Sequence, residues 1–310
     1  MLGTLLAALA LLTPATASWH ALPAAPEARS EVAAAVVNGG IAVVGGFEPA
    51  GAASPHVDWY VPRARRWKRL PDLPVGLHHA MAASDGRLLY VAGGYATREQ
   101  GFAPSRRAFV LDVAAADARW RELPPMPGAR AAGGAAFAER HLYIIAGVRR
   151  GLPRLARAAY AYDPGSRRWR TIPGPPTARE HLGVAALGGR IYALGGRTAG
   201  LDTNLRTADA YDIAARRWST LPRAPQARGG CAAASVSGRV LLVGGEEPGG
   251  TIARVDAFDP RTRRWSSLPP SPQPRHGVGV AATGGSVFQL LGGPRPGLTT
   301  SATALELTLR

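Results

Sequence analysis

Short apolar runs of about five residues recur along the chain, and each one ends at a doublet of small residues. Residues 89–92, 142–145 and 240–243 are such runs, rich in Leu, Val, Ile and Tyr. Runs of this length that are bounded by glycine are typical of buried β-strands. The doublets are Gly45-Gly46, Gly93-Gly94, Ala146-Gly147, Gly195-Gly196, Gly244-Gly245 and Gly292-Gly293. The pattern predicts an all-β chain built from a repeated unit.

A tryptophan follows each of the first five doublets at a spacing of roughly 22 residues, which sets a period of roughly 47 to 53 residues. These tryptophans are Trp67, Trp120, Trp169, Trp218 and Trp265. The sixth doublet is followed by none, but Trp19 lies about one period before Trp67. A repeat whose first segment completes its last unit predicts a closed ring.

Residues 179–222 illustrate the unit. Four strands are predicted, at residues 181–187, 190–194, 208–212 and 216–221, and Gly188-Gly189 marks a hairpin turn between the first two. One such sheet cannot bury both faces alone, so six are expected to stack around an axis. Residues 19–22 are expected to pair with residues 302–309 and supply the outer strand of the last unit, which removes the open edge.

The order Gly-Gly, then an aromatic residue, then Trp resembles the kelch repeat. Tyr60, Tyr162, Tyr211 and Phe258 each stand seven residues before a blade tryptophan. The resemblance covers residues 18–310, with Ala146 and Leu307 as departures from the usual glycine and tyrosine. It implies a six-bladed kelch β-propeller with four antiparallel strands per blade, the last blade closed by the N-terminal strand. Kelch proteins include enzymes, peptide-binding adaptors and scaffolds, so the family alone implies no single function.

The formal net charge is +16, but Lys68 is the only lysine and arginine supplies the rest of the positive charge. Without lysine-rich tails or basic helices, this charge is interpreted as a solvated surface, and no nucleic-acid partner is expected. Cys231 is the only cysteine, so no intrachain disulfide forms, and we expect it to be a small filler of an inner strand. The domain is expected to be a monomer.

Residues 1–17 have the pattern of a cleaved signal peptide. Residues 5–12 form an apolar run, and Ala15-Thr16-Ala17 is a small-x-small cleavage site. The run is too short to span a bilayer, so no membrane span is expected. The sequence therefore predicts a secreted or periplasmic protein whose propeller occupies residues 18–310.

Five of the six units carry an arginine at the start of the inner strand, close to where the loop after each doublet lies. These residues are Arg29, Arg130, Arg179, Arg228 and Arg275, the last being one residue further from its doublet than the others. One hypothesis is a positive channel mouth that binds an anionic small molecule, glycan or acidic peptide, with loop residues Arg197, Asn204, Tyr95 and Glu247 joining it. This resembles the acidic-peptide pocket of kelch adaptors. The alternative is that these arginines bond to neighbouring backbone or carboxylates.

Histidines and carboxylates follow the arginine position and differ between units. The first position after it holds His78, Glu180 and His276, which are candidates for general acid/base catalysis. The second holds Glu31, His79 and His181, which are the candidates if a metal binds. No tight motif supports a metal, so neither a metal nor another cofactor is expected. Polar residues bonded to water at a channel mouth are a further interpretation.

Three functions therefore remain open. The first is an exported propeller that binds an anionic ligand. The second is an enzyme, a mutarotase or isomerase of an acidic sugar, on a distant resemblance to exported bacterial kelch proteins of the sialic-acid mutarotase type. The third is a scaffold for protein interaction.

Overall fold

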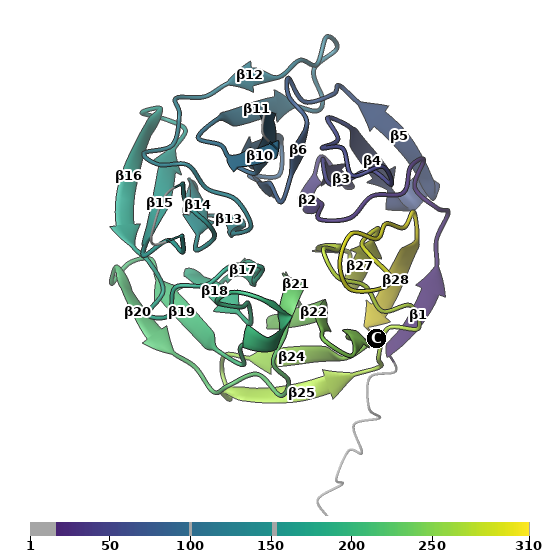
Figure 1. Cartoon of the computed structure of the whole chain (residues 1–310), viewed down its shortest axis with the longest axis vertical. Coiled ribbons are helices and arrows are strands. Elements are labelled where there is room, and N and C mark those ends of the chain that lie inside the picture. Colours follow the sequence, from purple (N-terminus) through teal and green to yellow (C-terminus); the bar gives the residue numbers. More distant parts are fainter. Residues whose placement is uncertain (1–16, 99–100, 151–153, 310) are drawn as a thin grey trace, which may run out of the picture.

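The computed structural model describes residues 17–98, 101–150 and 154–309, which form β-sheets arranged as blades around a central axis (Figure 1). Within these residues, six sheets contain the same four-strand antiparallel order. The predicted all-β kelch propeller fold is therefore confirmed. Among the described residues, no helix is long and apolar enough to cross a membrane.

Each blade runs from an inner strand beside the axis to an outer strand at the circumference. Blade 1 contains β2 (Ala33–Val37), β3 (Gly40–Val44), β4 (Val57–Val61) and β5 (Arg66–Leu70). Blade 2 contains β7 (Met81–Ser84), β8 (Leu88–Ala92), β11 (Ala108–Asp112) and β12 (Arg121–Glu122). Blade 3 contains β13 (Gly134–Ala138), β14 (His141–Ile145), β15 (Ala158–Asp163) and β16 (Arg168–Pro173). Blade 4 contains β17 (Gly183–Leu187), β18 (Arg190–Leu194), β19 (Ala208–Asp212) and β20 (Arg217–Thr220). Blade 5 contains β21 (Gly229–Val236), β22 (Arg239–Glu247), β24 (Val255–Asp259) and β25 (Arg264–Leu268).

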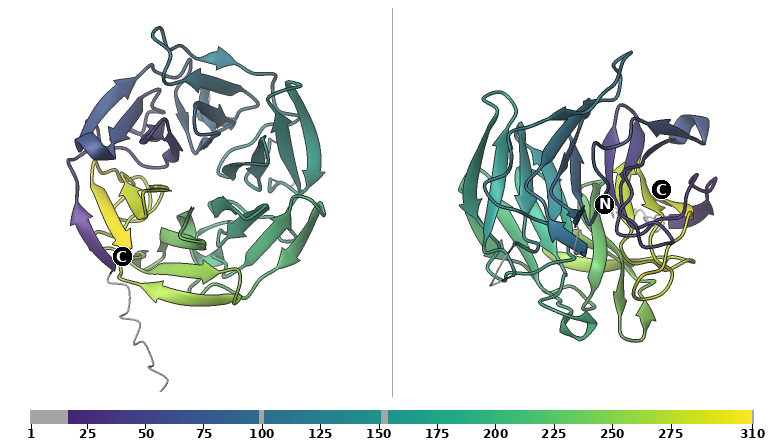
Figure 2. Two further views of the ribbon diagram at one scale, coloured as in Figure 1. Left: turned by 180° about the vertical axis from the view of Figure 1, so that it is seen from behind. Right: turned by 45° about the horizontal axis from the view of Figure 1, so that its top comes forward.

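Blade 6 joins the two ends of the described chain. It contains β26 (Gly279–Thr283), β27 (Ser286–Leu290), β28 (Ala304–Leu309) and, on the outside, β1 (Ala17–Ala21). Trp19 is the register partner of Leu307, as predicted, and the purple β1 lies beside the yellow β28 in Figures 1 and 2. Of the predicted signal peptide, residues 1–16 lie outside the described residues, and Ala17 pairs with Leu309.

Shorter elements decorate the blades. The strands β6 (Leu77–His78), β9 (Tyr95–Arg98) and β10 (Gly101–Pro104) form a small separate sheet. The last two belong to the long loop between β8 and β11 of blade 2. The strand β23 (Gly250–Thr251) pairs with β22. Two 3-10 turns complete the elements, η1 (Pro62–Ala64) and η2 (Leu201–Thr203).

Apolar side chains fill the space between neighbouring blades. Six clusters of buried residues are present in the described chain, one for each pair of adjacent blades. Tyr211 and Tyr192, which belong to two of these clusters, are each 2% exposed. The blades therefore hold one another through their faces, since no single four-stranded sheet could bury this surface by itself.

The repeated tryptophan also ties each blade to the previous one. In every described blade its indole N–H donates a hydrogen bond to a proline carbonyl oxygen at the end of the preceding blade, at 2.7–2.9 Å. The pairs are Trp19 with Pro269, Trp67 with Pro23, Trp120 with Pro71, Trp169 with Pro124, Trp218 with Pro173 and Trp265 with Pro222. Trp19 supplies the bond for blade 6, which is why the ring needs it.

The small doublets are needed because both residues adopt left-handed backbone angles. Gly45 and Gly46 have φ values of +58° and +106°, and the N–H of Gly46 donates to the carbonyl of the next blade's Leu77. In blade 6 the equivalent residues are Leu291 and Gly292, with φ values of +59° and +94°. The predicted doublet Gly292-Gly293 is thus wrong by one residue. When Leu291 is taken as the first residue of the doublet, Arg275 precedes the doublet by the same number of residues as the other blade arginines do.

Candidate functional site

Six residues, one from each blade, form a backbone ring around the axis just before the inner strands. They are Glu31, His79, Ala132, His181, Gly230 and Gly277. All have left-handed φ values between +52° and +65°. The N–H of each of the last five donates to the carbonyl of the preceding member at 2.8–3.1 Å, and Val32 N–H closes the circle on Gly277 at 3.2 Å. This ring fixes the positions from which side chains enter the channel.

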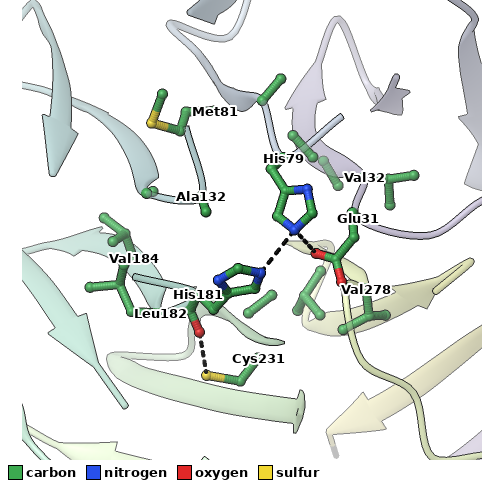
Figure 3. Close-up of a pocket in the computed structure, with 18 of the residues that line it drawn as sticks. Glu31, Val32, His79, Met81, Ala132, His181, Leu182, Val184, Cys231 and Val278 are labelled. Atoms are coloured by element: carbon green, nitrogen blue, oxygen red, sulfur yellow. Dashed lines mark hydrogen bonds and ion pairs between the residues drawn. The ribbon is translucent and has the colours of Figure 1, made fainter. Parts of the chain in front are cut away.

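Three of the six residues, Glu31, His79 and His181, have large polar side chains, and these converge (Figure 3). The Nε2 atoms of His79 and His181 are 2.8 Å apart. An oxygen of Glu31 lies 3.1 Å from the same Nε2 of His79. Burial lowers the pKa of His79 well below the ordinary histidine value, whereas the surrounding histidines hold the pKa of Glu31 well below its usual value against the opposing effect of burial. The sequence predicted these residues as a group, and the structure brings them together.

Two further carboxylates and a guanidinium surround this group. Arg197 donates to Glu246 at 2.8 Å and contacts Glu180 at 3.4 Å, and Glu180 lies 3.2 Å from Nδ1 of His181. Contacts with His181 and Arg197 lower the pKa of Glu180, although burial acts in the opposite direction. Glu180 is therefore a carboxylate at neutral pH and a poor proton donor.

His276 is held as an imidazolium. Its Nε2 lies 2.9 Å from the carbonyl oxygen of Arg295, which can only accept, so Nε2 carries a proton. Its Nδ1 faces Glu31 at 3.1 Å and Glu246 at 3.5 Å. Burial opposes the charge, but these carboxylates outweigh it and raise the pKa of His276.

His78 has the opposite character. Its ring stacks between Phe47 and Tyr95, with centroid separations of 3.8 and 5.1 Å. Burial among these rings lowers the pKa of His78 to about 4. The three residues predicted for acid/base work thus comprise a carboxylate, a neutral imidazole and a charged imidazole, and catalysis by them stays a prediction.

Titration should separate the two histidines in the chelator-treated protein. The His276 ring is expected to lose its proton above pH 6.5, while the His78 ring stays neutral until about pH 4. The carboxylates around His276 stabilise its charge, and the aromatic rings around His78 remove water from it. Ring carbon and nitrogen shifts followed by NMR would check this, with His276→Asn and His78→Asn assigning the signals. Two histidines that both titrate near 6.5 would contradict these environments.

A cavity of about 320 Å³ opens above the ring. Its floor includes Glu31, His79 and His181, and its walls include Phe47, Phe102 and Leu298. Phe102 and Leu298 are 41% and 57% exposed, and they are the exposed large hydrophobic residues of the described chain. A second cavity of about 110 Å³ lies on the other side of the same three polar residues, within the channel. The polar group therefore separates an apolar-walled mouth from the inner channel.

The prediction that the blade arginines line this mouth is wrong. Arg29, Arg179 and Arg228 are 0% exposed. They bind Asp58, Asp209 and Asp256 of their own blades at 2.5, 2.9 and 2.7 Å. Each guanidinium also donates to backbone carbonyls, which satisfies groups that would otherwise be buried without a partner.

The remaining two blade arginines are also turned inward. Arg130 is 2% exposed and lies over the ring of Tyr160, with the guanidinium 4.5 Å from the ring centroid. Arg275 is 9% exposed and donates to Thr303 and Gln273. The sequence held a signal for this. In the three blades whose arginine has an aspartate partner, that aspartate stands two residues before the aromatic residue of the repeat, which is Tyr60, Tyr211 or Phe258.

The predicted loop residues have mixed positions. Arg197 lines the mouth, but its guanidinium is shared by two carboxylates. Asn204 donates to the backbone of Glu246 at 2.6 Å, and Glu247 accepts from Gln226 at 3.1 Å. The role of Phe102 and Leu298 was missed. Phe102 could have been suspected because it is the large apolar residue in the middle of the longest loop.

Comparison with known proteins agrees with this fold. The model of the KLHDC2/KLHL20/DRC7 Kelch-repeats domain matches residues 78–293. The chain belongs to this kelch-repeat family. The Kelch motif model matches residues 28–74 of the same kelch domain, which includes the first blade. Kelch-like protein 34 of Homo sapiens is 30% identical over 150 residues, which is 48% of this chain and 22% of the relative. The match thus spans about a fifth of that relative's length.

Proposed function

We propose that this kelch domain is a protein-interaction propeller whose mouth receives an apolar-tipped segment of a partner protein. One observation carries the proposal: the exposed large apolar residues of the described chain, Phe102 and Leu298, both line one cavity. Exposed apolar side chains beside a concave site are typical of binding surfaces. The kelch family, which includes interaction domains, supports the same class of function.

The charges of the floor determine which polar group suits this mouth. Glu31 and Glu246 line it, Glu180 lies behind Arg197, and Arg197 is the arginine of the described residues that reaches the cavity. Two carboxylates already bind that guanidinium. A segment that offers hydrogen-bond donors or positive charge therefore fits the floor better than an acidic ligand does. The blade arginines that were expected to bind an anionic ligand are buried and do not line the mouth.

No contact favours the acidic-sugar isomerase over this function, because Glu180 is bound by Arg197 and His181. Export remains a proposal supported by the apolar run at residues 5–12 and the cleavage pattern at Ala15-Thr16-Ala17. An exported domain would present the mouth to partners outside the cytoplasm.

Selection from a displayed peptide library on the immobilised protein tests the interaction. Peptides with an apolar tip are expected to be enriched, and Phe102→Ser with Leu298→Ser should weaken them by about 10-fold or more, since each loses an apolar anchor. Arg261→Ser is the matched control, because its side chain is 87% exposed beside β25 of blade 5. The proposal would be overturned if no peptide were enriched, or if the Phe102 and Leu298 variants bound the selected peptides as strongly as the wild type does.

A further inference from the structure

The side chains of Glu31, His79 and His181 present three ligand atoms to one point on the axis. These atoms lie within 4.8 Å of one another. A neutral imidazole has one N–H. The Nε2 of His79 faces both Nε2 of His181 and an oxygen of Glu31. A single proton on that nitrogen points toward one of these two atoms, so it cannot make a hydrogen bond to both. Its Nδ1 also faces Nδ1 of His78 at 2.6 Å.

We propose that Glu31, His79 and His181 bind a divalent first-row transition metal ion of the zinc class. The inference goes beyond the interaction function, because the ligand set stands whether or not a partner enters the mouth. Imidazole nitrogens select zinc, cobalt, nickel or copper, whereas magnesium and calcium prefer all-oxygen sites. A tetrahedral ion with bonds of about 2.0–2.1 Å separates its ligand atoms by roughly 3.3 Å. The observed separations of 2.8 and 3.1 Å are slightly shorter than this, and the ligand atoms of Glu31 and His181 lie within 4.8 Å of each other, so a bound ion would shift the side chains to equalise the three separations.

The groups behind the ligands are arranged as in metal sites. Glu180 lies 3.2 Å from Nδ1 of His181, the nitrogen that would not bind the ion, and a carboxylate there fixes the ring and its tautomer. The second oxygen of Glu31 contacts His276 at 3.1 Å, which leaves the first oxygen directed at His79. Gly277 makes this possible, because a Cβ there would lie 2.5 Å from the Glu31 carboxyl carbon.

The competing group of Glu31, Glu246 and His276 also brings three ligand atoms close together. In that group Glu246 already binds the Arg197 guanidinium at 2.8 Å, and Nδ1 of His276 forms ion pairs with both carboxylates. That group is an ion pair, and it supports the ligand carboxylate from behind.

The metal would retain an open position. Three protein ligands leave the fourth place of a tetrahedral ion for water or an incoming group, as in exchangeable zinc sites. The same three residues line both the 320 Å³ mouth and the 110 Å³ inner cavity, so the open position would border one of these two cavities. A bound ion would also add positive charge at the floor, so the preference for a positively charged segment described above applies to the protein without the ion.

Zinc titration of the untagged full chain tests the proposal, after removal of metals with a chelator. Calorimetry is expected to show one strong site, and cobalt(II) should give the visible absorption of a tetrahedral complex. His79→Gln, His181→Gln and Glu31→Gln should each weaken binding by more than about 100-fold, since changes behind the ligands alone cost 10–100-fold. His141→Gln is the matched control, because His141 lies on β14 and its Nδ1 lies 2.7 Å from the backbone carbonyl oxygen of Glu139.

Unfolding midpoints measured with chelator show whether each variant folds, and the three ligand variants test the site independently if one of them does not. His276→Asn distinguishes the two groups: it changes a residue behind the ligands, so it should weaken zinc binding by at most about 10–100-fold, less than any of the three ligand variants. No strong site in the wild type, or zinc binding that survives both His79→Gln and His181→Gln, would overturn the proposal. Loss of zinc binding in His276→Asn with retention in His79→Gln would overturn this ligand set as well.

Discussion

Replacing Trp19 with alanine is expected to lower the free energy of unfolding by about 3 kcal/mol. The change removes the indole that packs against the cluster between blades 5 and 6 and donates to Pro269 at 2.9 Å. Trp19 lies in β1, which is held in blade 6 through its pairing with β28. Hydrogen exchange should therefore show that β28 loses protection together with β1, and denaturant unfolding measures the energy.

Two controls separate the closure from an ordinary loss of packing. Trp19→Phe removes the N–H but keeps most of the apolar surface, and should cost about 1 kcal/mol. Trp169→Ala removes the equivalent bond to Pro124, but its strand β16 continues covalently at both ends. That variant should leave the protection of β28 unchanged. Equal loss at β28 in both alanine variants would contradict a closure that depends on β1.

Replacing Arg179 with alanine is expected to destabilise the domain by about 3–5 kcal/mol, because it leaves the carboxylate of Asp209 buried without a counter-charge. Arg179 and Asp209 are 0% and 1% exposed, and their charged groups are 2.9 Å apart. The double variant Arg179→Ala with Asp209→Ala should be more stable than Arg179→Ala alone. Denaturant unfolding of the wild type, both single variants and the double variant gives the coupling energy.

Arg228→Ala is the internal comparison, and it should cost less. Its partner Asp256 keeps a second cation, since Arg254 donates to the other carboxylate oxygen at 2.6 Å. Equal losses in the two arginine variants, or a double variant no better than Arg179→Ala, would contradict this explanation. These arginines therefore stabilise their own blades, and replacing them would lower the stability of the fold whether or not a ligand binds.

The ring and its closure could be predicted because they follow from spacing alone. A period marked by tryptophan, with its missing member at Trp19, leaves one way to pair the chain ends, and Trp19 indeed opposes Leu307. Blade 6 shows the limit of the pattern. The fold needs a left-handed pair, which Leu291-Gly292 supplies, and the neighbouring Gly292-Gly293 in the sequence was mistaken for it.

The direction of side chains was harder to predict than their position. The arginine spacing was correct, but spacing does not say whether a guanidinium points to water or into its own blade. The aspartates at 58, 209 and 256 decide this, since each provides a buried partner on the third strand. Glu31, His79 and His181 were grouped correctly because they occupy equivalent places beside the axis, where every side chain points toward the others.

The backbone circle around the axis has a consequence for divergence within this architecture. Because Ala132 already adopts the same left-handed geometry as Glu31 and His79, the backbone conformation does not depend on which residue occupies the position. A new side chain at Gly230 would first meet Cβ of His276 at 3.2 Å, whereas one at Gly277 would collide with Glu31. A single substitution in this ring can therefore change the chemistry of the channel without altering the packing between blades, and Ala132, which already carries a Cβ there, is the most accommodating place.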